Sequence, residues 1–165
     1  MALLNVLVYP DSRLRKVATP VTEFNTELKK LADDMAQTMY DAPGIGLAAT
    51  QVNVSKRVVV IDISEDQNEL LTLVNPEIIE KDGEQVFDEG CLSVPDFYAE
   101  VTRANHIVVK AQDVTGKEFS IDTDELLAVC IQHEIDHLDG KVFVDYLSQA
   151  KRERVKKKML KRKPS

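Results

Sequence analysis

Two histidines four positions apart are the residues of this chain best suited to chemistry. Residues 132–140 read Gln-His-Glu-Ile-Asp-His-Leu-Asp-Gly and contain the pattern His-Glu-x-x-His. Side chains at positions i and i+4 share one face of a helix, so the imidazoles of His133 and His137 can bind one metal ion. Glu134 lies beside that face, where its carboxylate can take a proton from a metal-bound water. The pattern predicts a hydrolytic metal site, and two histidines on a solvated helix are the alternative.

A hydrolytic site of this kind needs a third protein ligand. Some metalloproteases place a third histidine ten residues after the first, but here that position is Phe143. Others use a glutamate further along the chain. After residue 140 the only side-chain carboxylates belong to Asp145 and Glu153, and Glu153 lies in a basic tail. We therefore expect the third ligand to come from the part of the chain before the histidines.

Two cysteines and one histidine are the upstream candidates. Cys91 is the best candidate for the third ligand. It follows Gly90 in a segment predicted to be irregular, so its backbone can adopt a conformation that points the sulfur at the metal. Cys130 lies about 10 Å along the helix axis from the second histidine, at 1.5 Å per residue, so we interpret it as pocket wall or core. His106 opens a predicted strand, and we expect it at the surface. A small buried hydrophobic residue is the alternative interpretation of Cys91.

Three helices are predicted around these residues. The run at 126–131 is uncharged and apolar, which predicts that the helix carrying the histidines is buried nearly all round. Asp122 and Glu125 have the spacing of a capping box at its start, and Gly140 supplies its stop. A second helix is predicted over about 26–41 from apolar residues at helical spacing. A third, basic helix is predicted at the C-terminus over 148–163, with Ser148 as its N-cap.

The predicted strands share β-branched or alternating apolar residues, and they cover 57–63, 70–79, 85–89, 103–113, 118–122 and 142–146. Residues 3–9 are expected to form a short strand or an extended arm, whereas 89–95 is not typical of any regular element. We predict one α+β domain over residues 1–165. In it, mixed or antiparallel sheets surround the central buried helix that carries His-Glu-x-x-His, with an N-terminal helix and a C-terminal helix beside them.

The net charge of −7 hides an asymmetry between the body of the chain and its tail. From Lys151 onward the chain has nine Lys or Arg residues and one acidic residue. The rest of the chain therefore has 12 of the 21 basic residues and 27 of the 28 acidic residues. We expect the acidic body not to bind DNA, whereas the tail can meet an anionic partner or remain a solvated helix. No apolar run approaches transmembrane length, and two cysteines without an export signal favour the cytoplasm and no membrane association.

Small residues dominate the stretch Gly44-Ile-Gly-Leu-Ala-Ala-Thr-Gln51. They let the backbone come close to a ligand or another chain. The glycine spacing fits neither a phosphate-binding loop nor a dinucleotide-binding turn. Gln51 is the one side chain in the stretch with a functional polar head. A tight turn that packs a helix on a sheet is the alternative interpretation.

Three stretches, 44–51, 89–93 (Glu-Gly-Cys-Leu-Ser) and 132–137 (Gln-His-Glu-Ile-Asp-His), resemble in order and spacing the signature motifs of bacterial peptide deformylase. The resemblance covers nearly the whole chain. This family removes the formyl group from N-terminal formylmethionine of newly made polypeptides and releases formate. The resemblance also implies that the basic C-terminal helix contacts the ribosome, and we expect a monomer in the cytoplasm.

The resemblance implies a role for each motif residue. The implied metal ligands are Cys91, His133 and His137. The implied catalytic groups are Glu134 as acid and base, and the Gln51 amide and the Leu92 backbone N–H as donors to an oxyanion. One divalent metal ion is expected, Fe²⁺ in the cell, and Zn²⁺ or Ni²⁺ can occupy the same site, because thiolate and imidazole suit several of these ions.

A formylmethionyl substrate would need an apolar pocket and an extended groove. We expect its backbone to pair beside residues 44–46, as in strand addition. The expected substrate contacts are Gly44, Ile45, Gly46, Phe87, Glu89, Gly90 and Cys130, with Leu126 and Ile131 as weaker candidates for the pocket. Partners that orient the histidines are expected among Glu89, Asp136 and Arg103. No substrate contact is assumed for the segment 95–98.

Two rival functions use the same residues. A metallopeptidase of the His-Glu-x-x-His type is the first, and the missing downstream ligand counts against it. A formyl-peptide binder without catalysis is the second, and Glu134 counts against it because binding alone needs no base.

Overall fold

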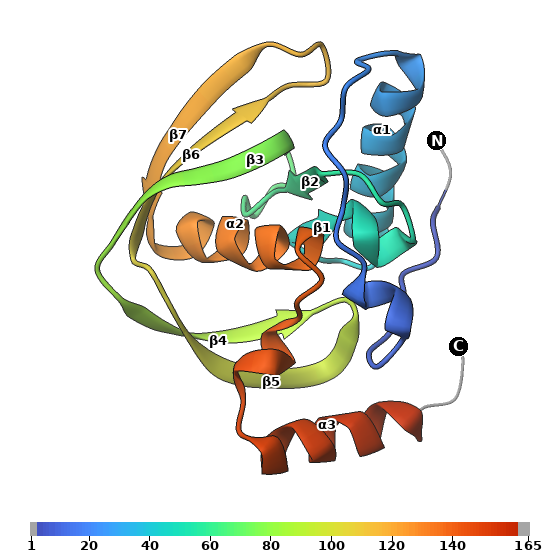
Figure 1. The fold of residues 1–165 in the computed structure, drawn as a ribbon, viewed down its shortest axis with the longest axis vertical. Coiled ribbons are helices and arrows are strands. Elements are labelled where there is room, and N and C mark those ends of the chain that lie inside the picture. Colours follow the sequence, from blue (N-terminus) through green and yellow to red (C-terminus); the bar gives the residue numbers. More distant parts are fainter. Residues whose placement is uncertain (1–2, 162–165) are drawn as a thin grey trace.

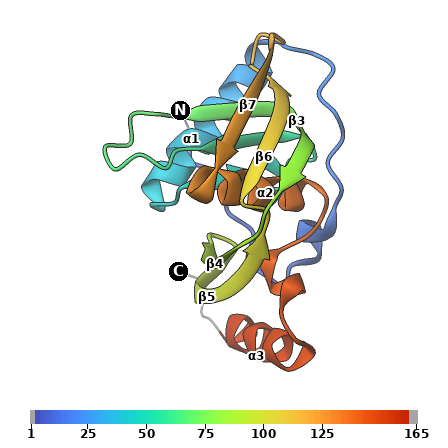
Figure 2. The ribbon, with the colours of Figure 1, turned by 90° about the vertical axis from the view of Figure 1, so that its left-hand side faces the viewer.

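The central helix lies between two antiparallel sheets in the computed structural model, which describes residues 3–161 (Figure 1). Helix α2 (Glu125–Leu138) carries the His-Glu-x-x-His pattern. A five-stranded sheet has the order β1-β2-β3-β6-β7, and β4 and β5 form a separate two-stranded sheet. Viewed from the side, the larger sheet lies on one side of α2 and the β4–β5 pair on the other (Figure 2). The predicted α+β class is confirmed.

The strands pair antiparallel throughout both sheets. Their bounds are β1 Gly46–Ala48, β2 Val58–Ile61, β3 Leu71–Asp82, β4 Gln85–Cys91, β5 Val94–Arg103, β6 His106–Gln112 and β7 Glu118–Asp124. The register of β3 on β6 shifts between Val74 and Glu77, where Pro76 cannot donate a ladder hydrogen bond. β3 stays paired with β6 to its last residue, Asp82, which lies opposite His106, and the chain then leads into β4 beneath α2 (Figure 1).

Helix α2 is buried along most of its length, as predicted, but its capping box is not formed. Asp124 is the N-cap and makes no side-chain cap bond. Asp122 instead pairs with Val108 in the β6–β7 ladder, so β7 runs directly into the helix. At the other end, Gly140 adopts φ +80°, the left-handed conformation that glycine favours, and it terminates the helix as expected.

Helix α1 (Thr26–Asp41) has the predicted bounds, and Asn25 caps it by accepting a hydrogen bond from the Leu28 N–H. Its methionines Met35 and Met39 are fully buried in a core cluster with residues of β1 and β2. They fill space between helix and sheet, which agrees with the adaptable packing of methionine.

One predicted element near the C-terminal end of the chain differs from the structure. The prediction of a strand at 142–146 was wrong, because Phe143–Tyr146 is the 3-10 helix η3. The Asp145 carboxylate accepts the Val142 N–H at 3.1 Å, which closes a turn where a strand would need a partner. Residues 3–9 were expected to form a short strand or an extended arm, and they belong to neither sheet.

Helix α3 (Gln149–Leu160) begins at Ser148, whose hydroxyl accepts the Lys151 N–H. Val155 and Met159 anchor it in a core cluster with η3 and β5, and the rest of the helix is exposed (Figure 1). Residues 162–163, the end of the predicted basic helix, lie outside the described residues. None of the helices within residues 3–161 is long and apolar enough to span a membrane.

Candidate metal centre

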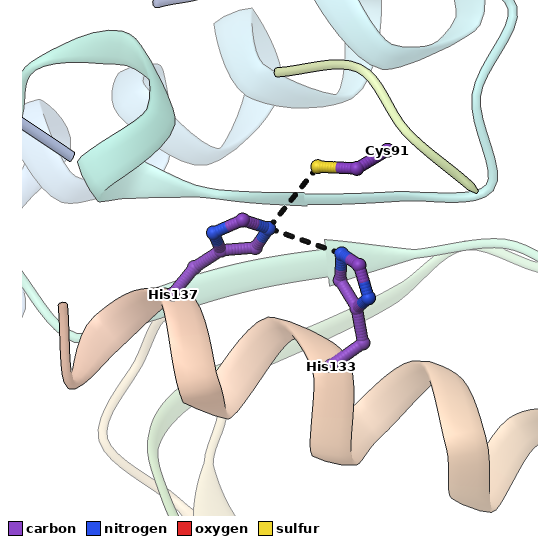
Figure 3. Close-up of side chains that lie close together, drawn as sticks. All are labelled: Cys91, His133 and His137. Atoms are coloured by element: carbon purple, nitrogen blue, oxygen red, sulfur yellow. Dashed lines mark hydrogen bonds between the residues drawn. The ribbon is translucent and has the colours of Figure 1, made fainter. Parts of the chain in front are cut away.

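One thiol and two imidazoles from distant parts of the chain converge beside α2 (Figure 3). His133 and His137 project from successive turns of α2, and Cys91 ends β4. The Cys91 sulfur lies 3.2 Å from His137 Nε2, and the two Nε2 atoms lie 3.0 Å apart. All three donor atoms lie within 4.8 Å of one another. One sulfur and two imidazole nitrogens form a donor set that suits a divalent transition metal with an open position.

The other sulfur and nitrogen candidates lie elsewhere. His106 bridges Asp82 and Asp122 on the large sheet and is not a member of the converging group. Cys130 is buried, and this burial raises the pKa of its thiol to about 12. Its sulfur therefore remains protonated at neutral pH, and Cys130 forms part of the pocket wall described below.

A carboxylate orients His133 from behind. Glu89 Oε1 accepts a hydrogen bond from His133 Nδ1 at 2.8 Å, which leaves Nε2 as the donor atom that faces the cluster. Arg103 holds the same carboxylate with two bonds, Nε to Oε2 at 2.8 Å and Nη2 to Oε1 at 2.9 Å. Burial alone would raise the pKa of Glu89, but the hydrogen bonds from Arg103 and His133 outweigh it and lower the pKa. Glu89 therefore stays ionised.

His137 has a different environment. It is fully buried, and burial together with the neighbouring His133 lowers its pKa well below the usual value. The ring is therefore neutral at pH 7 and keeps a lone pair for a metal. Its carbonyl accepts the Thr50 hydroxyl at 2.9 Å, which ties the last turn of α2 to the segment after β1.

Glu134 lies next to the ligands with its carboxylate against β1. Burial raises its pKa to about 7, which is close to the value that suits a group that both accepts and donates a proton. Among the described residues Oε1 has no hydrogen-bond partner, as expected of a group whose partner is a bound ligand or water. An added Cβ at Gly46 would lie 2.5 Å from Oε2, so glycine makes room for this carboxylate.

Gln51 reaches the cluster from the 3-10 helix η2 (Ala49–Val52). Its Nε2 lies 3.4 Å from the Cys91 sulfur and donates to Ser93 Oγ at 3.0 Å, and its Oε1 accepts the Ala48 N–H at 2.9 Å. The amide is therefore held with its nitrogen beside the ligand sulfur. The sequence analysis missed Ser93, which is fully buried and fixes this orientation. Its position two residues after Cys91 was the available signal.

A cavity of about 650 Å³ opens beside the ligands. It is lined by Leu92 and by all seven residues expected to contact substrate, which are Gly44, Ile45, Gly46, Phe87, Glu89, Gly90 and Cys130. Both carboxylate oxygens of Glu89 are taken by Arg103 and His133, so its side chain supports the histidine. Ile131 is fully buried and Leu126 packs against the same core cluster, and neither lines this cavity.

Comparisons with known proteins agree with this geometry. A family model described as polypeptide deformylase matches residues 3–153. A peptide deformylase of Polynucleobacter necessarius is 60% identical over 163 residues, covering 98% of this chain and 95% of the relative. One from Chromobacterium violaceum is 59% identical over 162 residues, covering 98% and 97%.

Solved structures give the same result. A peptide deformylase from Legionella pneumophila superposes with a TM-score of 0.94 at 51% identity, covering 99% of this chain and 100% of that one. The enzyme from Ehrlichia chaffeensis in complex with actinonin superposes with a TM-score of 0.94 at 38% identity, covering 100% of both chains. This chain belongs to the peptide deformylase family, the metal-dependent hydrolases that remove the N-formyl group from newly made polypeptides.

Proposed function

We propose that residues 1–165 work as one catalytic domain in which Cys91, His133 and His137 hold a single divalent metal ion. The observation that carries this proposal is the convergence of the three donor atoms within 4.8 Å. Fe²⁺ is the ion we expect in the cell, and the same donors accept Zn²⁺ or Ni²⁺. A bound divalent ion supplies a Lewis acid and lowers the pKa of water, which provides a nucleophile at neutral pH.

Glu134 is the proposed proton carrier of the reaction. It accepts the proton of the attacking water and delivers it to the leaving amine, which releases formate and a free N-terminus. Its burial and its pKa of about 7 support both steps, because the group can exist in either protonation state near neutrality.

Two donors are proposed for the negative charge that develops on the formyl oxygen. They are the Gln51 side-chain amide and the Leu92 backbone N–H. The fixed orientation of Gln51 beside the Cys91 sulfur supports this role. Loss of one such donor typically raises the barrier by about 3–4 kcal/mol.

The substrate is proposed to extend along the open edge of β1. This strand is the outermost in the order of the larger sheet, and residues 44–46 line the cavity. Backbone pairing there would hold the peptide, while the cavity takes the apolar side chain of its first residue. A formyl carbon carries only hydrogen, so a narrow site excludes larger acyl groups.

Replacing Glu134 by glutamine tests this assignment. The variant keeps the shape of the side chain but not the base, so it should retain a full metal content and lose formate release. Metal analysis and a formate assay on the same preparation measure both properties. Near-normal turnover in metal-loaded protein would remove Glu134 as the base.

A metallopeptidase remains the rival activity for the same motif. After α2, the Asp145 carboxylate is bound to Arg15, so it offers no ligand to the cluster. Measuring formate release beside casein cleavage separates the two activities.

The exposed basic residues of α3 are proposed to contact the ribosome, and the protein is proposed to act as a cytoplasmic monomer. Deleting residues 151–165 and measuring co-sedimentation with ribosomes tests the contact. Unchanged binding would leave α3 as a solvated helix.

A further inference from the structure

A buried ionic network lies behind the proposed metal ligand His133. At its centre is Arg103, whose side chain is 5% exposed. The guanidinium binds the Glu89 carboxylate through two hydrogen bonds, and its Nη1 binds the carboxylate of Asp136. Because Glu89 Oε1 also accepts the His133 Nδ1–H, the position of Arg103 is transmitted through one carboxylate to the ring of His133.

Tyr146 covers the solvent side of this network. The Arg103 guanidinium carbon lies 4.9 Å from the centre of the Tyr146 ring, and the Tyr146 hydroxyl donates to Asp136 at 2.7 Å. Burial raises the pKa of Tyr146 to about 12, and its bond to Asp136 acts in the same direction, so the phenol stays protonated and donates. The residue itself is 50% exposed. Its ring therefore forms the boundary between the buried charges and water.

The physical effect of that boundary follows from the cost of burying charge. The attraction within a buried ion pair offsets the cost of desolvation only if the geometry is good and the remaining polar atoms keep hydrogen-bond partners, and water that enters weakens this attraction by raising the local dielectric constant. The aromatic face also attracts the guanidinium directly. Without the ring, water would reach Arg103, and Asp136 would lose one of its hydrogen-bond donors. The two bonds from Arg103 to Glu89 would then hold that carboxylate less firmly, and the ring of His133 would gain freedom.

We propose that Tyr146 is a positioning residue for the metal centre, which acts through Arg103 and Glu89 to fix the imidazole of His133. This inference rests on the proposed role of His133 as a metal ligand. The residues that orient His133 then include, besides the Glu89 carboxylate that contacts it, the aromatic side chain of Tyr146 on η3, which lies outside both sheets and outside α2.

The chain offers a matched control. The hydroxyl of Tyr40 donates to the buried carboxylate of Asp62 at 2.6 Å, and burial likewise raises its pKa to about 12. This tyrosine lies on α1, and its bond belongs to the segment after β2, away from the ionic network. Tyr40→Phe therefore removes the same kind of hydrogen bond as Tyr146→Phe without touching Arg103.

The test measures how fast zinc-loaded protein transfers its metal to a chromophoric chelator in excess. Removing a group that directly orients a ligand typically costs about 10–100-fold in metal affinity. Tyr146 acts two steps further away, through Arg103 and then Glu89, so Tyr146→Ala should speed release by no more than about tenfold, at the low end of that range. Tyr146→Phe keeps the ring and should speed release by only about two- to threefold, and Tyr40→Phe should leave the rate unchanged. The exchange lifetime of the His133 Nδ1–H, followed by NMR, should shorten in the same order.

Two further variants locate a failure. If Tyr146 acts through Glu89, adding Tyr146→Ala to Glu89→Gln should change the release rate by less than about twofold, because the intermediate link is already broken. A wild-type release rate in folded Tyr146→Ala, or a full additional tenfold effect in the Glu89→Gln background, would overturn the proposal. His133→Ala checks the underlying site. If it binds zinc as tightly as the unmodified chain, the ligand assignment itself fails, whereas loss of zinc there with no effect of Tyr146→Ala refutes only the role of Tyr146.

Discussion

Replacing Gly46 by alanine should slow formate release strongly while leaving metal content unchanged. The added Cβ would lie 2.5 Å from Glu134 Oε2 and 3.1 Å from its Cδ. Gly46 does not have a positive φ, so alanine is compatible with the backbone and the effect comes from this contact alone. Relieving it to an ordinary separation requires the carboxylate to move by about 1 Å, a displacement that can cost about 100-fold in rate. That loss corresponds to about 2.7 kcal/mol in the activation barrier.

The assay is kcat for formate release from a formylmethionyl peptide, with metal content measured on the same samples. Gly44→Ala is a comparison at a neighbouring residue. The three nearest contacts of its new Cβ are all with Leu92, at 2.9–3.3 Å, so an effect on the proposed substrate contact should appear in KM rather than in kcat. We expect a much smaller loss of kcat in that variant than in Gly46→Ala.

A double variant shows whether the effect passes through the base. If Gly46→Ala acts by displacing Glu134, it should add little to the loss caused by Glu134→Gln. The reasoning is refuted if Gly46→Ala turns over at a near-normal rate. It is also refuted if the alanine lowers the rate of Glu134→Gln by a further 100-fold.

Two further predictions concern stability. Gly140→Ala should destabilise the fold by at least about 2 kcal/mol, because alanine is strained at a positive φ and its Cβ would lie 2.5 Å from the Arg15 carbonyl oxygen. Thermal unfolding should show a fall in Tm of about 4–8 °C. An unchanged Tm would contradict this prediction. The hydrogen bond to Asp122, with a second to Asp82, raises the pKa of His106 above 6.5, so its ion pairs stabilise the fold below pH 6.5 and lose this effect as the pH rises through the raised value. Urea unfolding as a function of pH should show that loss in the unmodified chain and not in His106→Gln; identical pH dependences would count against it.

Local signals explain the parts of the fold that the sequence predicted well. Helix α1 has a capping asparagine, apolar residues at helical spacing and Pro43 beyond its end, and all of these act within a few residues of one another. Its observed bounds are those predicted. The predicted strand at 142–146 failed for the opposite reason. Its valines suit a strand, but among the described residues the segment pairs with no strand, and Asp145 closes a turn instead.

Strand β5 was missed because its identity depends on its partner. Pro95 and three charged residues weaken the local strand signal over Val94–Arg103. The segment becomes a strand by pairing with β4, from Gln85 opposite Arg103 to Cys91 opposite Val94. The supposedly irregular stretch around Cys91 is therefore the end of a hairpin, and this hairpin brings the sulfur to the histidines.

The site divides in the same way. The helical spacing of His133 and His137 places them together by geometry alone. Cys91 is 46 residues from His137 in the chain. The sequence could rank it above the other candidates for the third ligand, but it could not show that the sulfur meets the histidines. The two hydrogen bonds from Arg103 to Glu89, and the packing of the Tyr146 ring on the Arg103 guanidinium, require β4, β5 and η3 to pack together. No local pattern in the sequence predicts them.

X-ray absorption of zinc-loaded protein tests the central assignment most directly. One sulfur at about 2.3 Å and histidine nitrogens at about 2.0–2.1 Å should surround the metal. The sulfur contribution should disappear in Cys91→Ser and persist in Cys130→Ala. A metal environment without sulfur in the unmodified chain, or one that keeps its sulfur in Cys91→Ser, would contradict the proposed centre.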